Sequence, residues 1–158
     1  MRSVRNPVLT VNPFEAEAFV LIEPSVLEVL DQFRQDTTLK PESGGILLGY
    51  RRGLHLHIVE ATRPMQDDRR SRFSFDRAPH GHRQVAMRRW QESNRQIDYL
   101  GEWHSHPESF PSPSSIDIRG WQALAASQGK PMLFIIVGND TTDWFGVGVG
   151  TQITQLTF

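Results

Sequence analysis

The sequence predicts an α/β fold in which helices flank a mixed β-sheet. Apolar runs of strand length alternate along the chain with stretches whose apolar residues recur at helical spacing, the order that α/β domains show. Two of the runs, Gly44–Tyr50 and Met132–Val137, are apolar at most positions and resemble strands buried on both faces. The 158 residues contain no repeat and no low-complexity linker, so we expect a single domain over residues 1–158.

The first part of the chain is expected to supply four strands and one helix. The strands are short apolar runs at Val8–Val11, Ala18–Ile22, Gly44–Tyr50 and Leu54–Ala61. The helix is expected from Pro24 to about Arg34, because a first helical turn tolerates proline and apolar residues follow at helical spacing. His55 and His57 alternate with apolar residues and are assigned to the solvent side of their strand.

The second part of the chain is expected to continue this alternation after a long polar segment. Residues 63–79 are predicted to form a surface loop with a short strand around Phe73 and Phe75. Three prolines make residues 106–113 a second loop. The remaining expected elements are helices at Gly81–Arg95 and Ser115–Ser127 and strands at Ile97–His104, Met132–Val137, Trp144–Gly150 and Gln152–Thr157.

The composition excludes several kinds of site. The 17 basic and 18 acidic residues give a formal net charge of −1, which lacks the basic footprint of a nucleic-acid-binding protein. Local basic excess, interpreted as solvated surface, occurs at Arg69, Arg70, Arg72, Arg83, Arg88 and Arg89. Because the chain has no cysteine, disulfides and thiolate metal ligands are excluded, and a metal site must use histidine and carboxylate ligands.

Membrane and targeting signals are also missing from the sequence. No apolar run reaches the ~18 residues of a membrane-spanning helix. The segment Met1–Pro7 is basic but has no apolar core before Pro7, unlike a signal peptide. We therefore expect no membrane association, and the absence of cysteine agrees with the cytoplasmic location that we predict.

A histidine pair followed by an aspartate carries the strongest functional signal. In His104-Ser-His106-Pro107 the histidines occupy positions i and i+2 at the end of a predicted strand, so both side chains point to the same side. Asp117 is expected in the first turn of the next helix, where the chain can double back onto the pair. Two imidazoles and a carboxylate suit a catalytic zinc site, which keeps a fourth position open. We therefore predict a zinc site at these three residues.

A catalytic zinc site also needs a general base, and two acidic residues are candidates. Glu102 lies on the same side of its strand as the histidines, which also suits a partner of a metal ligand. Glu42 precedes the glycine-rich strand segment Gly44–Gly49, where missing side chains permit close approach of a substrate or metal. We favour Glu42, although spacing alone does not decide between the two.

These motifs resemble those of the JAMM/MPN-plus zinc metallopeptidases. The segment Glu42-Ser-Gly-Gly-Ile-Leu-Leu-Gly is similar to the glutamate-bearing strand of that family. Its metal-binding signature is similar to His104-Ser-His106-Pro followed by Ser114-x-x-Asp117. The resemblance implies a cytidine-deaminase-like α/β fold and zinc ligation by His104, His106 and Asp117. It also implies acid–base catalysis by Glu42 and stabilisation of the oxyanion by Ser114.

A narrower resemblance is to the small bacterial JAMM peptidases of CBASS antiphage operons. It is carried by Tyr-Leu-Gly-Glu-Trp-His-Ser-His-Pro-Glu at 99–108, by Pro-Ser-Pro-Ser-Ser-Ile-Asp at 111–117 and by Trp121. It implies a zinc-dependent isopeptidase that removes a ubiquitin-like protein or a cGAS-like nucleotidyltransferase from target proteins. The implied partner is a protein whose extended C-terminal tail is joined to a lysine amine.

Other interpretations of the same residues stay open at this point. A peptidase of this kind could process a sulfur-carrier or ubiquitin-like precursor, and a non-catalytic scaffold of the same fold could bind a protein partner. The Ser114-x-x-Asp117 pattern also matches a helix capping box. His80 and His82 are expected in a loop, with a structural role favoured over substrate contact. The sequence makes no prediction of the oligomeric state.

Overall fold

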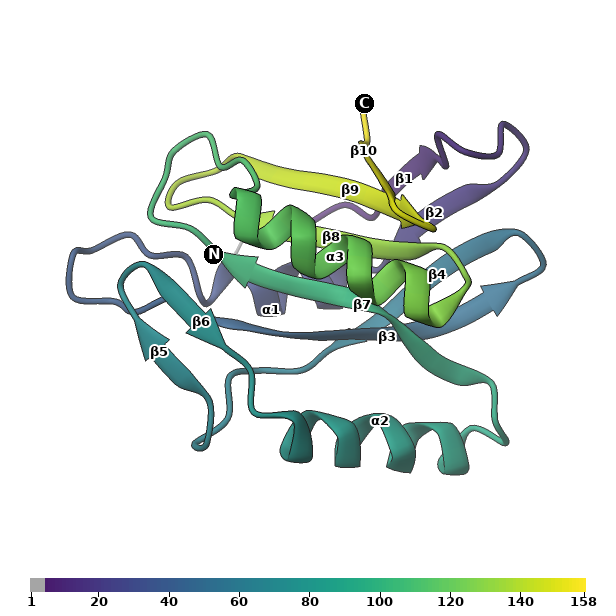
Figure 1. Ribbon diagram of the computed structural model, residues 1–158, viewed down its shortest axis with the longest axis horizontal. Coiled ribbons are helices and arrows are strands. Elements are labelled where there is room, and N and C mark those ends of the chain that lie inside the picture. The colour runs from purple at the N-terminus through teal and green to yellow at the C-terminus, as the bar shows by residue number, and fades with distance from the viewer. Residues whose placement is uncertain (1–4) are drawn as a thin grey trace.

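A twisted, mixed β-sheet with helices on its two faces is the main feature of the computed structural model, which describes residues 5–158 (Figure 1). Within this range the eight strands of the sheet are β1 Val8–Val11, β2 Phe19–Ile22, β3 Gly44–Arg52, β4 His55–Ala61, β7 Ile97–Ser105, β8 Met132–Val137, β9 Asp143–Val149 and β10 Gln152–Gln155. The other elements are the helices α1 Pro24–Asp31, α2 Pro79–Glu92 and α3 Ser115–Gln128, and a separate hairpin of β5 Arg69–Ser71 and β6 Ser74–Asp76.

The strand order places β7 in the interior of the sheet. In the described chain the order is β1-β2-β4-β3-β7-β8-β9-β10, with parallel pairing of β2 with β4 and of β7 with β8 and antiparallel pairing elsewhere. Because α3 connects β7 to β8, its N-terminus lies near the C-terminal end of β7 (Figure 1). Ligands of open α/β sheets bind at such strand ends. The predicted α/β class with a mixed sheet is confirmed.

Two apolar clusters, one on each face of the sheet, hold the helices in place. α1 packs its buried residues into one cluster, and α3 packs Trp121 and Ala125 into the other. Strand β8 contributes to both, with Leu133, Ile135 and Val137 on the α1 side and Met132, Phe134 and Ile136 on the α3 side. All six side chains are fully buried. The continuous apolar run in the sequence therefore reflects a strand covered on both faces.

The helix α1 is shorter than the sequence pattern predicts, since it ends at Asp31 and not near Arg34. Past its end the amides of Gln32 and Phe33 donate to carbonyls three residues back, which tightens the chain into a turn. Phe33 still packs against the core after the helix has ended. Its helical spacing therefore reflected burial and not continuation of the helix.

The segment from 63 to 92 differs most from the expected structure. The predicted short strand around Phe73 and Phe75 is instead a two-stranded hairpin, with Phe73 in its turn and Phe75 in β6. The prediction that His80 and His82 lie in a loop is wrong, because α2 begins at Pro79 and contains both. Proline favours the first position of a helix, so the helix starts before the glycine taken as its boundary.

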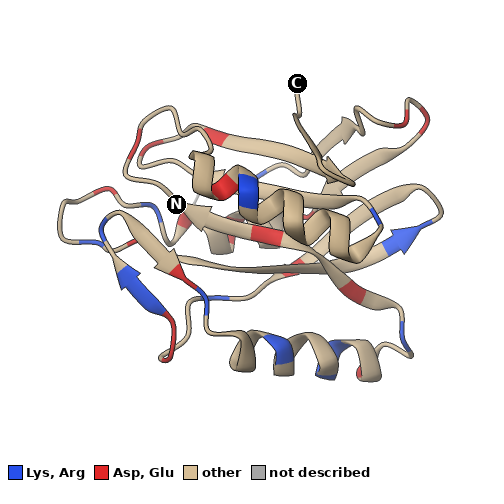
Figure 2. Ribbon diagram, viewed as in Figure 1, with Lys and Arg blue, Asp and Glu red and all other residues tan. Residues whose placement is uncertain are grey.

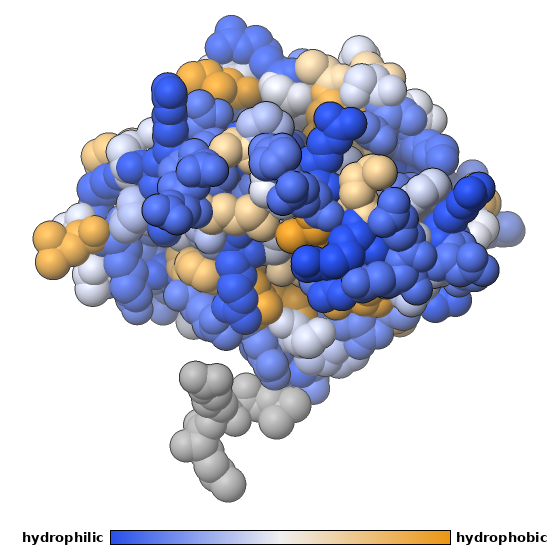
Figure 3. Space-filling view, turned by 90° about the horizontal axis from the view of Figure 1, so that it is seen from below, coloured by the Kyte–Doolittle hydropathy of each residue, from blue (hydrophilic) through white to orange (hydrophobic). Residues whose placement is uncertain are grey.

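Charged side chains are distributed over the surface without a face of one sign in the view of Figure 2. The face on which α2 lies is mostly hydrophilic, with apolar side chains only in small groups (Figure 3). Arg83 and Arg88 are exposed there, and Arg89 pairs with Glu60 at 2.8 Å. This agrees with a solvated helix face for these arginines. Among the helices of residues 5–158, none combines the length and apolar character needed to cross a bilayer.

Candidate metal centre and active site

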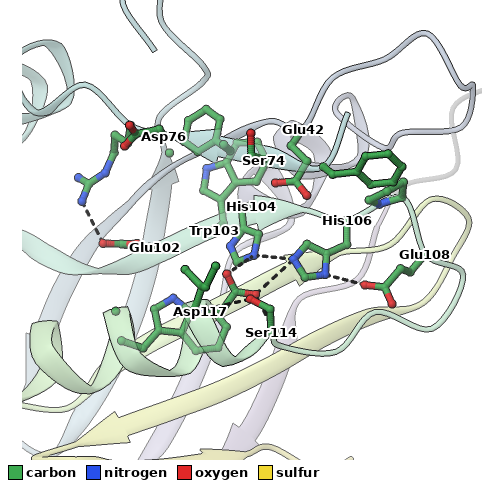
Figure 4. Close-up of a pocket in the computed structure, with 18 residues that line it drawn as sticks. Glu42, Ser74, Asp76, Glu102, Trp103, His104, His106, Glu108, Ser114 and Asp117 are labelled. Carbon is green, nitrogen blue, oxygen red and sulfur yellow. Dashed lines mark hydrogen bonds and ion pairs between the residues drawn. The ribbon is translucent and has the colours of Figure 1, made fainter. Parts of the chain in front are cut away.

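The pairing of β3 with β7 brings Glu42 opposite His106. The amide of Ser105 donates to the carbonyl of Ser43 at 2.8 Å, and the amide of Ser43 donates to the Oγ of Ser105 at 2.9 Å. The two serines are therefore neighbours across the strands, and one step further Glu42 faces His106. Residues that lie directly opposite in an antiparallel pair share one side of the sheet. Figure 4 accordingly shows the Glu42 carboxylate on the same side as the two imidazoles.

The side chains of His104, His106 and Asp117 converge on one point. The Nε2 atoms of the histidines are 3.0 Å apart, and they lie 3.4 Å and 3.3 Å from the two carboxylate oxygens of Asp117. Zinc bonds of ~2.0–2.1 Å at tetrahedral angles would place neighbouring ligand atoms ~3.3–3.4 Å apart. The three distances are close to this tetrahedral spacing, so the two imidazoles and the carboxylate fit a single divalent cation. Among the described residues this trio forms a cluster able to hold a metal ion.

Asp117 is held in place by the start of α3. Its Oδ2 accepts from the amide of Ser114 at 2.8 Å, and the Oγ of Ser114 accepts from the amide of Asp117 at 3.1 Å, which completes a capping box. The capping pattern anticipated from the sequence is thus present alongside the metal-facing carboxylate. Burial alone would raise the pKa of Asp117, but hydrogen bonds with His104 and His106 hold it well below its usual range. Asp117 is therefore a carboxylate at neutral pH, the form that can bind a metal ion.

The backbone of Glu42 is fixed by the β5–β6 hairpin. Its amide donates to the carbonyl of Ser71 at 2.7 Å, and its carbonyl accepts from the guanidinium of Arg70 at 2.9 Å. The same guanidinium donates to the Oγ of Ser43 at 2.7 Å. The hairpin therefore orders the segment that carries Glu42, which contributes to a defined position of its carboxylate beside the histidines.

The carboxyl group of Glu42 is buried, with 6% of the residue exposed. Burial raises its pKa from 4.5 to about 7, and the nearby His106 opposes that rise, while the charges of Asp117 and Glu108 add to it. A carboxyl with a pKa near neutrality can both accept and return a proton. This is the electrostatic character expected of a general base.

These residues line a cleft of about 710 Å³ that also includes Ser114. Two exposed apolar side chains, Phe73 of the hairpin and Ile116 of α3, stand at its margin. The structure thus brings together every site residue predicted from the sequence, which are Glu42, His104, His106, Ser114 and Asp117. Their arrangement suits hydrolysis of a carbonyl compound that enters from the open side of the cleft.

The paired glycines of β3, Gly44 and Gly45, make room for neighbouring protein atoms. A Cβ atom on Gly44 would lie 2.6 Å from the ring of Phe75, and one on Gly45 would lie 2.3 Å from the carbonyl of Thr62. The irregularity in the β3–β7 pairing lies further along, between Leu47 and Leu48. The space left by these glycines is thus occupied by neighbouring protein atoms, and the pairing with β7 is regular at both positions.

Glu102 and Glu108 both face the cleft but have different partners. Glu102 accepts from Arg77 at 2.9 Å and from the hydroxyl of Tyr99 at 3.1 Å, which directs it away from His104, His106 and Asp117 (Figure 4). The Oε1 of Glu108 lies 2.7 Å from the Nδ1 of His106. Glu42 is therefore better placed than Glu102 to act as the base.

The other two histidine pairs have structural surroundings. His57 contacts Glu23 at 2.7 Å and His55 accepts from the amide of Phe19 at 2.8 Å; both are partly exposed, as expected for the solvent side of β4. His80 is exposed on α2, whereas His82 is fully buried. Neither pair has the convergence seen for His104 and His106.

Sequence reasoning missed a buried polar network around His82. Its Nδ1 lies 2.7 Å from the Oγ1 of Thr62 and its Nε2 lies 2.9 Å from the Oδ2 of Asp68, with both His82 and Asp68 side chains inaccessible to solvent. Asp68 also accepts from the amides of Met65 and Ala78. The network therefore ties both ends of the hairpin-bearing segment to β4 and α2. Asp68 and Thr62 lie 14 and 20 positions before His82, so no local sequence pattern could have revealed the network.

Known proteins are similar to this chain over most of its length. Similar proteins carry the name CD-NTase/cGAS isopeptidase: one from Escherichia coli is 38% identical over 96% of this chain and 94% of its own length. Another from Pseudomonas aeruginosa is 42% identical over 73% and 75%, and one from Vibrio cholerae is 37% identical over 84% and 83%. A solution structure of a protein from Desulfitobacterium hafniense has a TM-score of 0.61 and 19% identity, covering 85% of this chain and 87% of that one, which supports the fold.

The family model described as prokaryotic homologs of the JAB domain matches residues 25–147. This range runs from the first turn of α1 into β9 and contains the cleft residues Glu42, His104, His106 and Asp117. The JAMM-type resemblance predicted from the sequence is confirmed. The chain belongs to the prokaryotic JAB-domain family.

Proposed function

We propose that this protein is a zinc-dependent isopeptidase that releases a CD-NTase/cGAS-type protein from its conjugates. The observation that carries the proposal is the meeting of three metal-competent side chains with a buried carboxyl of raised pKa in one open cleft. Family membership and the names of the relatives support a peptidase of this class. Zinc is favoured because two imidazoles and one carboxylate form a mixed nitrogen and oxygen set that leaves a ligand position open.

The proposed reaction divides its roles among the residues of the cleft. His104, His106 and Asp117 would hold the metal, which supplies Lewis-acid polarisation of the scissile carbonyl and lowers the pKa of water beside it. Glu42 takes the proton from the attacking water and passes it to the leaving amine. Because the Oγ of Ser114 accepts from the amide of Asp117, its own O–H is free to donate to the developing oxyanion.

The proposed substrate is a protein whose C-terminal tail is joined to a lysine amine. The cleft is open to solvent, so an extended tail and the lysine side chain joined to it can both reach His104, His106 and Asp117. We also propose that residues 1–158 act as one domain, because a single sheet contains strands from Val8 to Gln155. A cytoplasmic location stays a prediction from the sequence.

Glu42→Ala tests the assignment of the base. The variant is expected to bind one Zn²⁺ per chain like the unaltered protein but to lose at least about 100-fold in cleavage rate, because only the proton transfer is removed. The substrate is a CD-NTase C-terminal tail fused to a reporter, with the cleavage position read by mass spectrometry. Full activity of the variant would contradict the assignment. Binding of the fusion without turnover by the metal-loaded, unaltered protein would favour a scaffold.

A further inference from the structure

Glu108 makes a contact with a metal-binding histidine that the proposed reaction does not use. Its Oε1 lies 2.7 Å from the Nδ1 of His106, on the side of the ring opposite to the Nε2 that faces Asp117 (Figure 4). A carboxylate only accepts hydrogen bonds, so the Nδ1 must carry the proton. In the neutral imidazole the lone pair then lies on Nε2, which is the state that ligates a metal.

The two histidines are oriented by different means. The His104 ring lies against the indole of Trp121, with centroids 5.8 Å apart, and Trp121 is itself stacked on Phe134 in the core. The His106 ring is aligned by the carboxylate of Glu108. Packing can hold one ring, whereas a hydrogen bond both holds the other and selects its tautomer.

The backbone around Glu108 is anchored independently of its side chain. The carbonyl of Glu108 accepts from the amide of Asn139 at 2.9 Å, and the amide of His106 donates to the carbonyl of Val137 at 3.0 Å. The close approach of Gly138, whose Cβ would lie 3.0 Å from the Glu108 carbonyl, keeps the two segments together. The side chain is nevertheless exposed beyond its carboxylate contact. A substitution at position 108 is therefore expected to leave the loop in place.

We propose that Glu108 is a positioning residue for the metal centre. It fixes the tautomer and orientation of His106 and raises the basicity of this ligand through the Nδ1–H hydrogen bond. The proposal rests on the proposed function in one respect, the binding of a metal by His104, His106 and Asp117. Glu108 is thus a fourth side chain of the metal centre, and its substitution should change metal affinity directly and cleavage only as a consequence.

The test measures Zn²⁺ affinity by competition with a chelating dye, using the metal alone and the full chain. Glu108→Ala is expected to weaken Zn²⁺ binding about 10- to 100-fold, the range seen when partners of metal ligands are removed. Glu108→Gln is expected to recover most of that loss, because its amide oxygen still accepts from Nδ1. Glu102→Gln is the matched control: it removes a negative charge from the same cleft, but Glu102 contacts Arg77 and Tyr99 instead of a metal ligand.

A second readout separates orientation from charge. With Co²⁺ in place of zinc, the visible absorption bands report the geometry of the ligands, and Glu108→Ala is expected to shift them while Glu108→Gln and Glu102→Gln leave them unchanged. Thermal unfolding of the metal-free variants should match the unaltered protein, which excludes misfolding as the cause.

Three results would overturn the proposal, and they differ in what else they affect. Equal Zn²⁺ affinity of Glu108→Ala and the unaltered protein removes the positioning role and leaves the proposed isopeptidase intact. An equal loss in Glu102→Gln would show that only the charge of the cleft matters. If the unaltered protein binds no Zn²⁺, the metal assignment fails and the role of Glu108 fails with it.

Discussion

Two clusters in which histidine meets aspartate, one at the end of β7 and one around α2, have different roles. At the end of β7, His104 and His106 meet Asp117, and their side chains stay 11 to 18% exposed at the cleft. Around α2, His82 meets Asp68 and Thr62, and the side chains of His82 and Asp68 have no exposure at all. In the first cluster the nitrogen and oxygen atoms of three side chains converge on one point, whereas in the second each polar atom faces a protein partner. Convergence with access, and not residue type, distinguishes a site from a structural network.

The largest expected effect comes from Asp117→Asn, which breaks the first cluster. The asparagine oxygen can still accept from the Ser114 amide, so the start of α3 should persist. Loss of the anionic ligand should weaken metal binding by at least about 1,000-fold, or about 4 kcal/mol, and abolish cleavage. Metal titration measures the affinity and circular dichroism measures the helix content. The control is Asp140→Asn, a substitution at an exposed position. Unchanged affinity would mean that Asp117 only caps its helix.

The second cluster should respond in stability and not in metal binding. His82→Ala leaves the carboxylate of Asp68 buried without its main partner and opens space in the interior, so the free energy of unfolding should fall by about 3 kcal/mol. Urea unfolding measures this loss. His80→Ala, an exposed position in the same helical turn, should change it by less than about 0.5 kcal/mol. If His82→Ala lost metal affinity and kept its stability, His82 would belong to the metal site and not to a structural network.

A smaller effect is expected at Glu42, where the raised pKa that suits a general base should lower the stability of the protein at high pH. The folded-state pKa of Glu42, about 7, lies above the unfolded value of 4.5. Its contribution to stability is therefore fully present below pH 4.5 and is lost as the pH rises through about 7. Glu42→Gln removes this loss, so the metal-free variant should be more stable than the unaltered protein by about 2 kcal/mol at pH 8.5, with the difference shrinking toward pH 5. A pH-independent difference in urea unfolding would exclude an ionisable origin.

The convergence of His104, His106 and Asp117 was predictable because short-range geometry determines most of it. Alternation along a strand puts His104 and His106 on one side, and the proline after them ends the strand at that point. Asp117 follows a capping serine, which places it in a first helical turn. By contrast, the position of Glu42 depends on the register between β3 and β7, which spacing along the chain does not encode; the family resemblance supplied that assignment.

The parts of the molecule that the sequence did not predict depend on long-range contacts. The β5–β6 hairpin lies in a polar segment without periodicity and is held by Arg70, Ser71 and Asp68 through backbone and side-chain hydrogen bonds. Ile116 has an apolar side chain at a helix start, yet it is exposed at the cleft. Burial of such residues follows from which elements meet in space, and local patterns carry little of that information.

The tight fit of Gly44 against Phe75 sets the direction in which this cleft can be reshaped by protein engineering. A larger residue at position 44 would displace the aromatic ring and, with it, the hairpin that orders Glu42. On the opposite wall, a Cβ atom added at Gly120 would meet nothing within 4 Å. Variant libraries that aim to alter substrate selectivity should therefore change residues of α3 around Gly120 and leave Gly44 unchanged.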